Sequence, residues 1–135
     1  MKNKSNRILV VDDDQLLREF YDRVFENMGY SSVCVSDGQE AIDFLENAES
    51  PFALVIMDLL MPVKTGWEAI EYIRRNEQWR GLPILAITGM ACSEEELGMI
   101  REKCDDVILK PEFEMHHFHE AVDRLIKHGP THTRR

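Results

Sequence analysis

The sequence predicts an α/β protein, a doubly wound parallel sheet built from five strand–helix units in a (βα)5 arrangement. Five short apolar runs alternate along the chain with amphipathic segments at helical spacing. The runs are apolar at consecutive positions, as in strands that helices cover on both faces. With 135 residues, 44% of them hydrophobic and 30% charged, the chain has the size and balance of one globular domain. We expect this domain over 1–128 and a disordered tail over 129–135.

The first half of the chain contains three of the runs and two amphipathic segments. The run at 7–11 predicts a strand. The apolar stripe after it, which includes Tyr21, ends at Gly29, a residue suited to a left-handed helix stop. The run at 31–35 predicts the second strand, and a helix follows that begins within SDGQE. The run at 53–57 predicts the third strand.

The second half repeats the alternation. TGWE at 65–68 has capping-box spacing, so we expect the third helix to begin there. The run at 83–88 predicts the fourth strand, and SEEE at 93–96 has capping-box spacing at the start of a weak fourth helix. The run at 106–110 predicts the fifth strand. An apolar stripe from Phe118 onward marks the last helix.

Charge and composition exclude several classes of partner. The formal net charge is −9, from 16 basic and 25 acidic residues. An acidic surface repels nucleic acid and anionic membranes, so we expect neither as a direct partner. No apolar run is long enough to span a bilayer. Three cysteines without CxxC spacing indicate reduced thiols in a cytoplasmic protein.

Polar residues follow four of the five runs where the predicted strands end. Asp12 and Asp13 come after the first strand, Asp58 after the third, Thr88 ends the fourth and Lys110 ends the fifth. All carboxyl ends of a parallel sheet lie along one edge, where ligands bind at the point at which the strand order reverses. In the order 2-1-3-4-5 that point lies between the first and third strands. The acidic residues of these two strands should therefore face each other.

This set of side chains predicts a phosphoryl site. Several carboxylates in one pocket need a counter-charge. Hard oxygen ligands suit Mg²⁺, which keeps several waters and binds one or two carboxylates together with phosphate oxygens. Lys110 adds a cation and Thr88 adds a hydroxyl donor. Together they describe a site for a phosphoryl group beside Mg²⁺, with a carboxylate able to act as nucleophile.

At this point the sequence resembles the receiver domain of two-component response regulators, over roughly 7–127. Four separated motifs occur in the order of that family, each at a predicted strand end, and this makes the resemblance specific. The resemblance implies a flavodoxin-like three-layer sandwich. The matching segments are ILVVDDD at 8–14, VIMDLLMP at 55–62 with TGWE behind it, ITG at 87–89 and LKP at 109–111.

The resemblance also implies a reaction. A histidine kinase or a histidine phosphotransfer protein would donate a phosphoryl group to Asp58, which would become a 4-aspartylphosphate. Asp13 and Asp58 would bind Mg²⁺ through their side chains and Leu60 through its backbone carbonyl. Asp12 would complete the acidic pocket through a metal-bound water. The chain would then be a phosphoacceptor signalling domain and not an enzyme, although it would catalyse its own phosphorylation.

The same resemblance implies a switch. Thr88 would hydrogen-bond the phosphoryl group, and Lys110 would pair with it. The bond between Lys110 and Pro111 is typically cis in this family. Movement after phosphorylation would bias the face formed by the fourth helix, the fifth strand and the fifth helix. That face would act on a downstream partner or output domain, and it is a candidate homodimer surface.

Two features depart from the usual receiver pattern. Val107 stands where receivers usually have Tyr or Phe, so the output cannot depend on an aromatic ring that swings in and out. Leu60 and Met90 occupy positions that influence water access to the phosphoryl group. Two apolar side chains there predict slow autodephosphorylation.

Other interpretations remain open. A small phosphatase resembling the haloacid-dehalogenase family would use Asp12 as nucleophile and Asp14 as acid/base. A pseudo-receiver would keep the fold without phosphorylation. His116 and His119 lie three apart, but we favour solvated histidines over a metal site because no further ligands stand nearby. The sequence does not distinguish a stand-alone regulator from a piece of a hybrid kinase or transcription factor.

Overall fold

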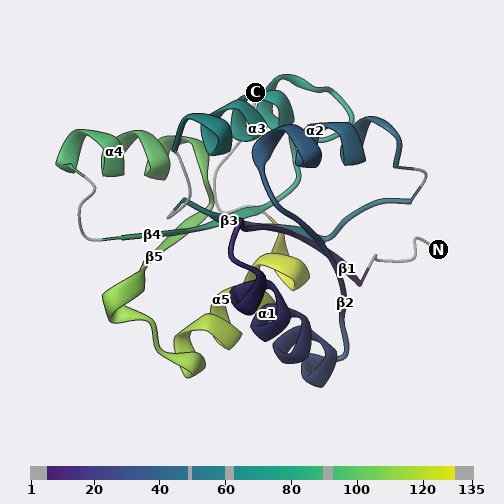
Figure 1. Cartoon of the computed structure of the whole chain (residues 1–135), viewed down its shortest axis with the longest axis vertical. Helices are drawn as coiled ribbons and strands as arrows, with labels where there is room; N and C mark the ends of the chain where they lie inside the picture. Colours follow the sequence, from purple (N-terminus) through teal and green to yellow (C-terminus); the bar gives the residue numbers. More distant parts are fainter. Residues whose placement is uncertain (1–5, 49, 60–62, 90–92, 130–135) are drawn as a thin grey trace.

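A parallel sheet of five strands forms the middle layer of the protein (Figure 1). The structure is a computed structural model and describes residues 6–48, 50–59, 63–89 and 93–129. The strand order is β2-β1-β3-β4-β5, and every pair is parallel, as the sequence predicts. In chain order the elements are β1 (Arg7–Val11), α1 (Gln15–Met28), β2 (Ser31–Val35), α2 (Gly38–Glu46), β3 (Leu54–Asp58), α3 (Val63–Arg75), β4 (Ile84–Thr88), α4 (Glu94–Lys103), β5 (Asp106–Leu109), the 3-10 helix η1 (Lys110–Glu112) and α5 (Met115–His128).

Helices cover both faces of the sheet, with α2, α3 and α4 on one face and α1 and α5 on the other (Figure 1). Every residue of β3 and β4 is buried, which explains why their sequences are apolar at consecutive positions. The two faces form separate cores. Tyr21, Phe25 and Phe118 are fully buried in the core between the sheet and the helices α1 and α5.

Local capping fixes the helix ends. The Asp14 carboxylate accepts hydrogen bonds from the backbone N–H groups of Leu16 and Leu17 and so caps α1. At the other end of α1, Gly29 adopts φ 90°, which is the predicted left-handed stop. Ser93 and Glu96 form a reciprocal capping box at the start of α4, as predicted.

The predicted start of the third helix is wrong. α3 begins at Val63, so Thr65 lies inside the helix and is not its N-cap. The Thr-x-x-Glu spacing also places two residues on the same side of any helix turn, so it occurs in helix interiors as well as at their starts. The spacing alone therefore did not locate the helix start.

The fifth strand ends earlier than predicted. β5 stops at Leu109, and Lys110 already begins η1. The expected cis bond before Pro111 is also wrong, since no peptide bond among the described residues is cis. Proline occupies the first turn of η1, where its fixed φ suits a helical turn and its missing N–H is not needed.

Candidate functional site

The strand register gathers four of the predicted site residues at one edge of the sheet. Val11 of β1 pairs with Met57 of β3, so the next residues along the two strands, Asp12 and Asp58, lie on neighbouring strands at the same level. Asp58 pairs with Ile87 of β4, one residue before Thr88. This is the edge at which we expected the acidic residues to face each other.

The last strand completes this edge. Thr88 pairs with Leu109 of β5, one residue before Lys110. Lys110 is half-buried and stands at the turn from β5 into η1. Each of the strands β1, β3, β4 and β5 thus places at least one predicted site residue at its carboxyl end.

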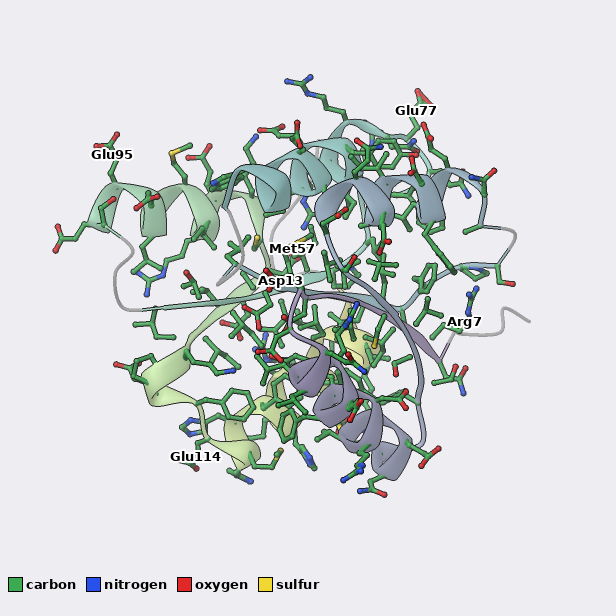
Figure 2. The ribbon with its side chains drawn as sticks, in the orientation of Figure 1. Arg7, Asp13, Met57, Glu77, Glu95 and Glu114 are labelled. Carbon is green, nitrogen blue, oxygen red and sulfur yellow. The ribbon has the colours of Figure 1, made fainter. Side chains whose placement is uncertain are left out.

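Burial separates these residues into a floor and a rim. Asp12, Asp58 and Thr88 are 2%, 0% and 3% exposed, so they form the floor. Asp13 is exposed and lies where β1 leads into α1 (Figure 2). Two buried carboxylates on neighbouring strands are costly to the fold unless hydrogen bonds and a positive charge stabilise them.

Asp12 shows where that charge is needed. Its Oδ1 accepts a hydrogen bond from the backbone N–H of Asp14 at 2.8 Å, which closes the turn into α1. Its Oδ2 is buried and has no hydrogen-bond partner among the described residues. Buried polar atoms almost always have a partner, so this oxygen is a candidate ligand for a cation or for a water bound to one.

A further side chain of the site comes from α1. The Tyr21 hydroxyl donates to Asp58 Oδ2 at 3.5 Å, and both side chains are fully buried. Burial raises the pKa of Tyr21 well above its ordinary value, and the neighbouring Asp58 and Asp12 carboxylates raise it further. Sequence reasoning assigned Tyr21 only to the apolar stripe of its helix. The sequence signal for the contact between Tyr21 and Asp58 is a tyrosine, which has a polar hydroxyl, on the helix that begins at the site.

The residues present fit Mg²⁺. This ion takes oxygen ligands, keeps several waters and needs only one or two protein carboxylates. Asp12 and Asp58 supply two buried carboxylates at the ends of adjacent strands, and one oxygen of Asp12 has no partner within residues 6–48, 50–59, 63–89 and 93–129. No cluster of three or more His, Cys, Asp or Glu side chains in the described part of the chain has the geometry of a metal site. A Mg²⁺ ion at this site would complete its shell with water and phosphate oxygens.

Two of the predicted positions lie outside the described residues. These are Leu60, the expected backbone ligand, and Met90, which together with Leu60 predicts slow decay. Val107 is described: it is half-buried on β5 and packs against the core on the α2–α4 side of the sheet.

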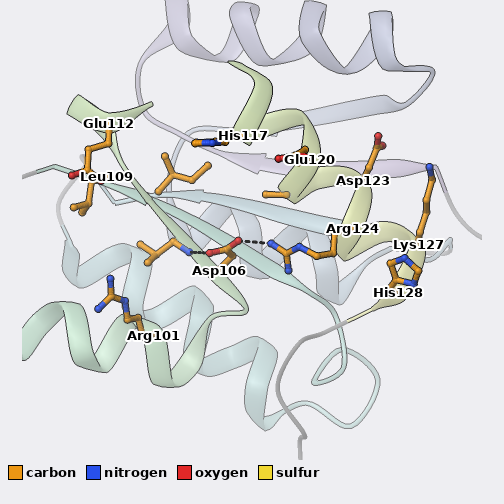
Figure 3. Close-up of a pocket in the computed structure, with 13 residues that line it drawn as sticks. Arg101, Asp106, Leu109, Glu112, His117, Glu120, Asp123, Arg124, Lys127 and His128 are labelled. Atoms are coloured by element: carbon orange, nitrogen blue, oxygen red, sulfur yellow. Dashed lines mark hydrogen bonds and ion pairs between the residues drawn. The ribbon is translucent and has the colours of Figure 1, made fainter. Parts of the chain in front are cut away.

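A second hollow lies on the face formed by α4, β5 and α5 (Figure 3). Asp106 of β5 forms an ion pair with Arg124 of α5 across it. Arg101 of α4 and Lys127 near the end of α5 also line it.

Within the part of the chain that the structure describes, no helix is both long enough and apolar enough to span a bilayer.

Comparison with known proteins assigns the family. The family model described as the response regulator receiver domain matches residues 8–123 of this chain. The chain belongs to that family. It is therefore a receiver domain of two-component signalling, with a flavodoxin-like fold.

Relatives of this receiver domain fall into two groups. It is 37% identical over 78% of its length to the CAI-1 autoinducer sensor kinase/phosphatase CqsS of Vibrio cholerae, but it spans only 15% of that protein. It is 26% identical over 77% of its length to the polar-differentiation response regulator DivK of Brucella ovis, and it spans 83% of that protein. The receiver domain thus matches both a small part of a long kinase and most of a short regulator.

A solved structure shows the same fold. The receiver domain of the sensor histidine kinase PA1611 from Pseudomonas aeruginosa PAO1 superposes with a TM-score of 0.77 at 26% identity. The match covers 91% of this chain and 98% of that one. That structure contains a magnesium ion coordinated in the active site cleft.

Proposed function

We propose that this receiver domain accepts a phosphoryl group from a phosphohistidine partner onto Asp58 in a Mg²⁺-dependent reaction. The observation behind the proposal is the buried pair of carboxylates, Asp12 and Asp58, at the ends of adjacent strands, with one oxygen of Asp12 that has no partner among the described residues. A buried acidic pair of this kind is costly to the fold and is explained by a cationic ligand. The magnesium ion in the cleft of the PA1611 receiver supports the choice of ion.

In the proposed reaction, an oxygen of Asp58 attacks phosphorus, an O–P bond forms, and the N–P bond of the donor histidine breaks. The electron pair of that bond stays on the imidazole nitrogen, which then takes a proton from solvent. Asp13, Asp58 and the backbone carbonyl of Leu60 would hold Mg²⁺, with Asp12 acting through a metal-bound water, and the ion would supply positive charge for the phosphoryl oxygens. Thr88 would donate a hydrogen bond to the phosphoryl group, and Lys110 would pair with it. Burial keeps bulk water away from Asp58.

The partners in this proposal follow from the relatives. Since one relative is a sensor kinase/phosphatase, we propose that a histidine kinase or a histidine phosphotransfer protein donates the phosphoryl group. We propose further that phosphorylation changes the α4–β5–α5 face, which then acts on a downstream partner, an output domain or a second copy of this chain. The hollow beside Asp106 lies on that face.

A small phosphodonor tests the proposal without a known kinase. The chain is incubated with phosphoramidate, which has the same kind of N–P bond as phosphohistidine, and the intact mass is recorded with Mg²⁺ and with a chelator. We expect one phosphoryl group per chain with Mg²⁺, and none with the chelator or in the Asp58→Asn variant. Asp43→Asn is the matched control, because Asp43 is an exposed carboxylate on α2, away from the site, that accepts a hydrogen bond from Gln39 of its own helix.

The same assay distinguishes the phosphatase alternative. Continuous release of phosphate that survives Asp58→Asn and stops in Asp12→Asn would support an enzyme and overturn the receiver reaction. A stable adduct that requires Asp58 supports the receiver reaction.

A further inference from the structure

A side chain of α1 contacts Asp58 from the side of the sheet that α1 and α5 cover. Tyr21 is fully buried, and its hydroxyl donates to Asp58 Oδ2 at 3.5 Å. Its ring packs against Phe25 and Phe118, with ring centroids 6.3 Å and 5.9 Å away, so the ring is anchored in the aromatic core between the sheet and the helices α1 and α5. The hydroxyl is thus fixed at the floor of the site while the ring belongs to the core.

This hydroxyl remains a hydrogen-bond donor under all ordinary conditions. A tyrosine phenol has an ordinary pKa of about 10, so it keeps its proton at neutral pH. A neutral phenol can donate one hydrogen bond, and an ionised carboxylate is a stronger acceptor than the carbonyl oxygen of an acyl phosphate. The bond therefore strengthens whenever the Asp58 carboxylate regains its negative charge.

We propose that Tyr21 shortens the lifetime of the phosphorylated receiver by donating a hydrogen bond to Asp58 as this side chain leaves phosphorus. The inference rests on the proposed function and adds a residue to it. In the decay step, water attacks phosphorus, an O–P bond forms, and the bond from phosphorus to Asp58 breaks. The electron pair stays on the Asp58 carboxylate, and the proton from water goes to solvent or phosphate. Tyr21 keeps its own proton throughout.

The direction of the effect separates this role from simple packing. If Tyr21 only filled the core, its loss would loosen the floor of the site, admit water and leave decay unchanged or faster. As a donor to the leaving carboxylate, Tyr21 stabilises the transition state for decay more than it stabilises the acyl phosphate ground state, and so it lowers the barrier. Its removal should then slow decay.

The test is the decay of the acyl phosphate in Tyr21→Phe, which removes only the hydroxyl. Wild type and variant are phosphorylated with phosphoramidate and Mg²⁺, freed of donor, and followed by intact mass. We expect the variant to decay about threefold to tenfold more slowly, the difference between a charge-assisted and a neutral hydrogen bond. Tyr30→Phe is the matched control: it also removes a tyrosine hydroxyl bonded to an aspartate, Asp123, but away from the site, and should decay at the wild-type rate.

Each outcome of this experiment either supports or overturns the inference. Slower decay in Tyr21→Phe, with Tyr30→Phe unchanged, supports the inference. Equal or faster decay in a folded Tyr21→Phe variant overturns it and leaves the proposed function intact, whereas an unlabelled wild-type chain overturns the proposed function and the inference with it. If Tyr21→Phe does not fold, 3-fluorotyrosine at position 21, a more acidic phenol and a stronger donor, decides: faster decay supports the inference, and unchanged or slower decay overturns it.

Discussion

At the scale of single residues, the molecule contains buried aspartates of two opposite kinds. Asp105 is fully buried, and its Oδ2 lies 2.9 Å from Nη2 of Arg74 and also accepts the backbone N–H of Ile84 at 2.8 Å. Asp12 is also buried, but its Oδ2 has no hydrogen-bond partner in the part of the chain that the structure describes. The Asp105 carboxylate stabilises the fold through these two bonds, whereas the Asp12 carboxylate lowers its stability. Buried groups that lower stability are typical of functional sites.

Neutralising these two aspartates should therefore change stability in opposite directions. Without Mg²⁺, Asp12→Asn should raise the free energy of unfolding by about 1 kcal/mol, because it removes a buried charge beside Asp58. Asp105→Asn should lower it by about 3 kcal/mol, because Arg74, whose side chain is 7% exposed, would lose its ion pair with a buried carboxylate. Urea unfolding in the presence of a chelator measures both. Equal destabilisation by the two changes would contradict this account.

The positions of single residues were predictable from the sequence where a strand end determines them. Asp12, Asp58 and Thr88 follow directly from the positions at which apolar runs stop. The contact of Tyr21 with Asp58 was not predictable, because an aromatic in a helical apolar stripe has the pattern of a core residue. The pairing of Arg74 with Asp105 was also missed, since the two residues are 31 positions apart and depend on how α3 packs beside the start of β5.

At the scale of elements, α4 is the α-helix with the fewest buried residues. Ile100 is its one buried side chain, and Met99 is 51% exposed. Its interior contains Gly98, which favours the unfolded chain relative to Ala. A Cβ at this position would meet nothing within 4 Å.

Gly98→Ala should thus stabilise α4 by about 0.5–1 kcal/mol. Slower amide hydrogen exchange in α4, together with a midpoint of thermal unfolding raised by about 2–5 °C, is the expected result. Because the proposed output face includes α4, the phosphorylation-induced change in exchange should also shrink there. Unchanged exchange in α4 would show that Gly98 does not limit its stability.

A hydrogen bond between elements makes stability sensitive to high pH. Tyr30, just after α1, donates to Asp123 Oδ1 of α5 at 3.0 Å. Burial, with this bond and the Asp123 charge, raises the pKa of Tyr30 from 10.0 to about 12. A group that holds its proton more tightly in the folded chain stabilises it fully below the unfolded pKa, and this stabilisation is lost as pH rises through the folded pKa.

The stability difference between wild type and Tyr30→Phe should consequently be largest below pH 10 and shrink between pH 10 and about 12. Comparing the variant with wild type at each pH cancels the contributions of other groups. Denaturant unfolding at several pH values in this window measures the difference. A difference that stays constant to the upper end would show that the bond does not contribute through the Tyr30 proton.

At the scale of the whole molecule, the sequence predicted the architecture because β3 and β4 are buried on both faces and so apolar throughout. It predicted the position of the site because parallel strands end at one edge. It did not predict the start of α3, since Thr-x-x-Glu spacing is not unique to helix starts. Nor did the resemblance predict the trans bond before Pro111.

A bound cation should couple the site to the stability of the whole chain. Mg²⁺ at a hundredfold excess over its dissociation constant should raise the free energy of unfolding by about 2.7 kcal/mol, because the unfolded chain has no such site. Thermal unfolding with MgCl₂, against NaCl at equal ionic strength, measures this. Asp58→Asn should abolish most of the Mg²⁺ effect, while Asp43→Asn should retain it. Equal shifts in both variants would place the ion elsewhere.

The most direct test of the central claim is the atom to which the phosphoryl group attaches. The chain is phosphorylated with phosphoramidate and Mg²⁺, the acyl phosphate is reduced with borohydride to homoserine, and the digested peptides are sequenced by mass spectrometry. We predict homoserine at position 58 and unmodified aspartate at position 12. Homoserine at position 12, or a phosphoryl group retained only on histidine, would contradict the account.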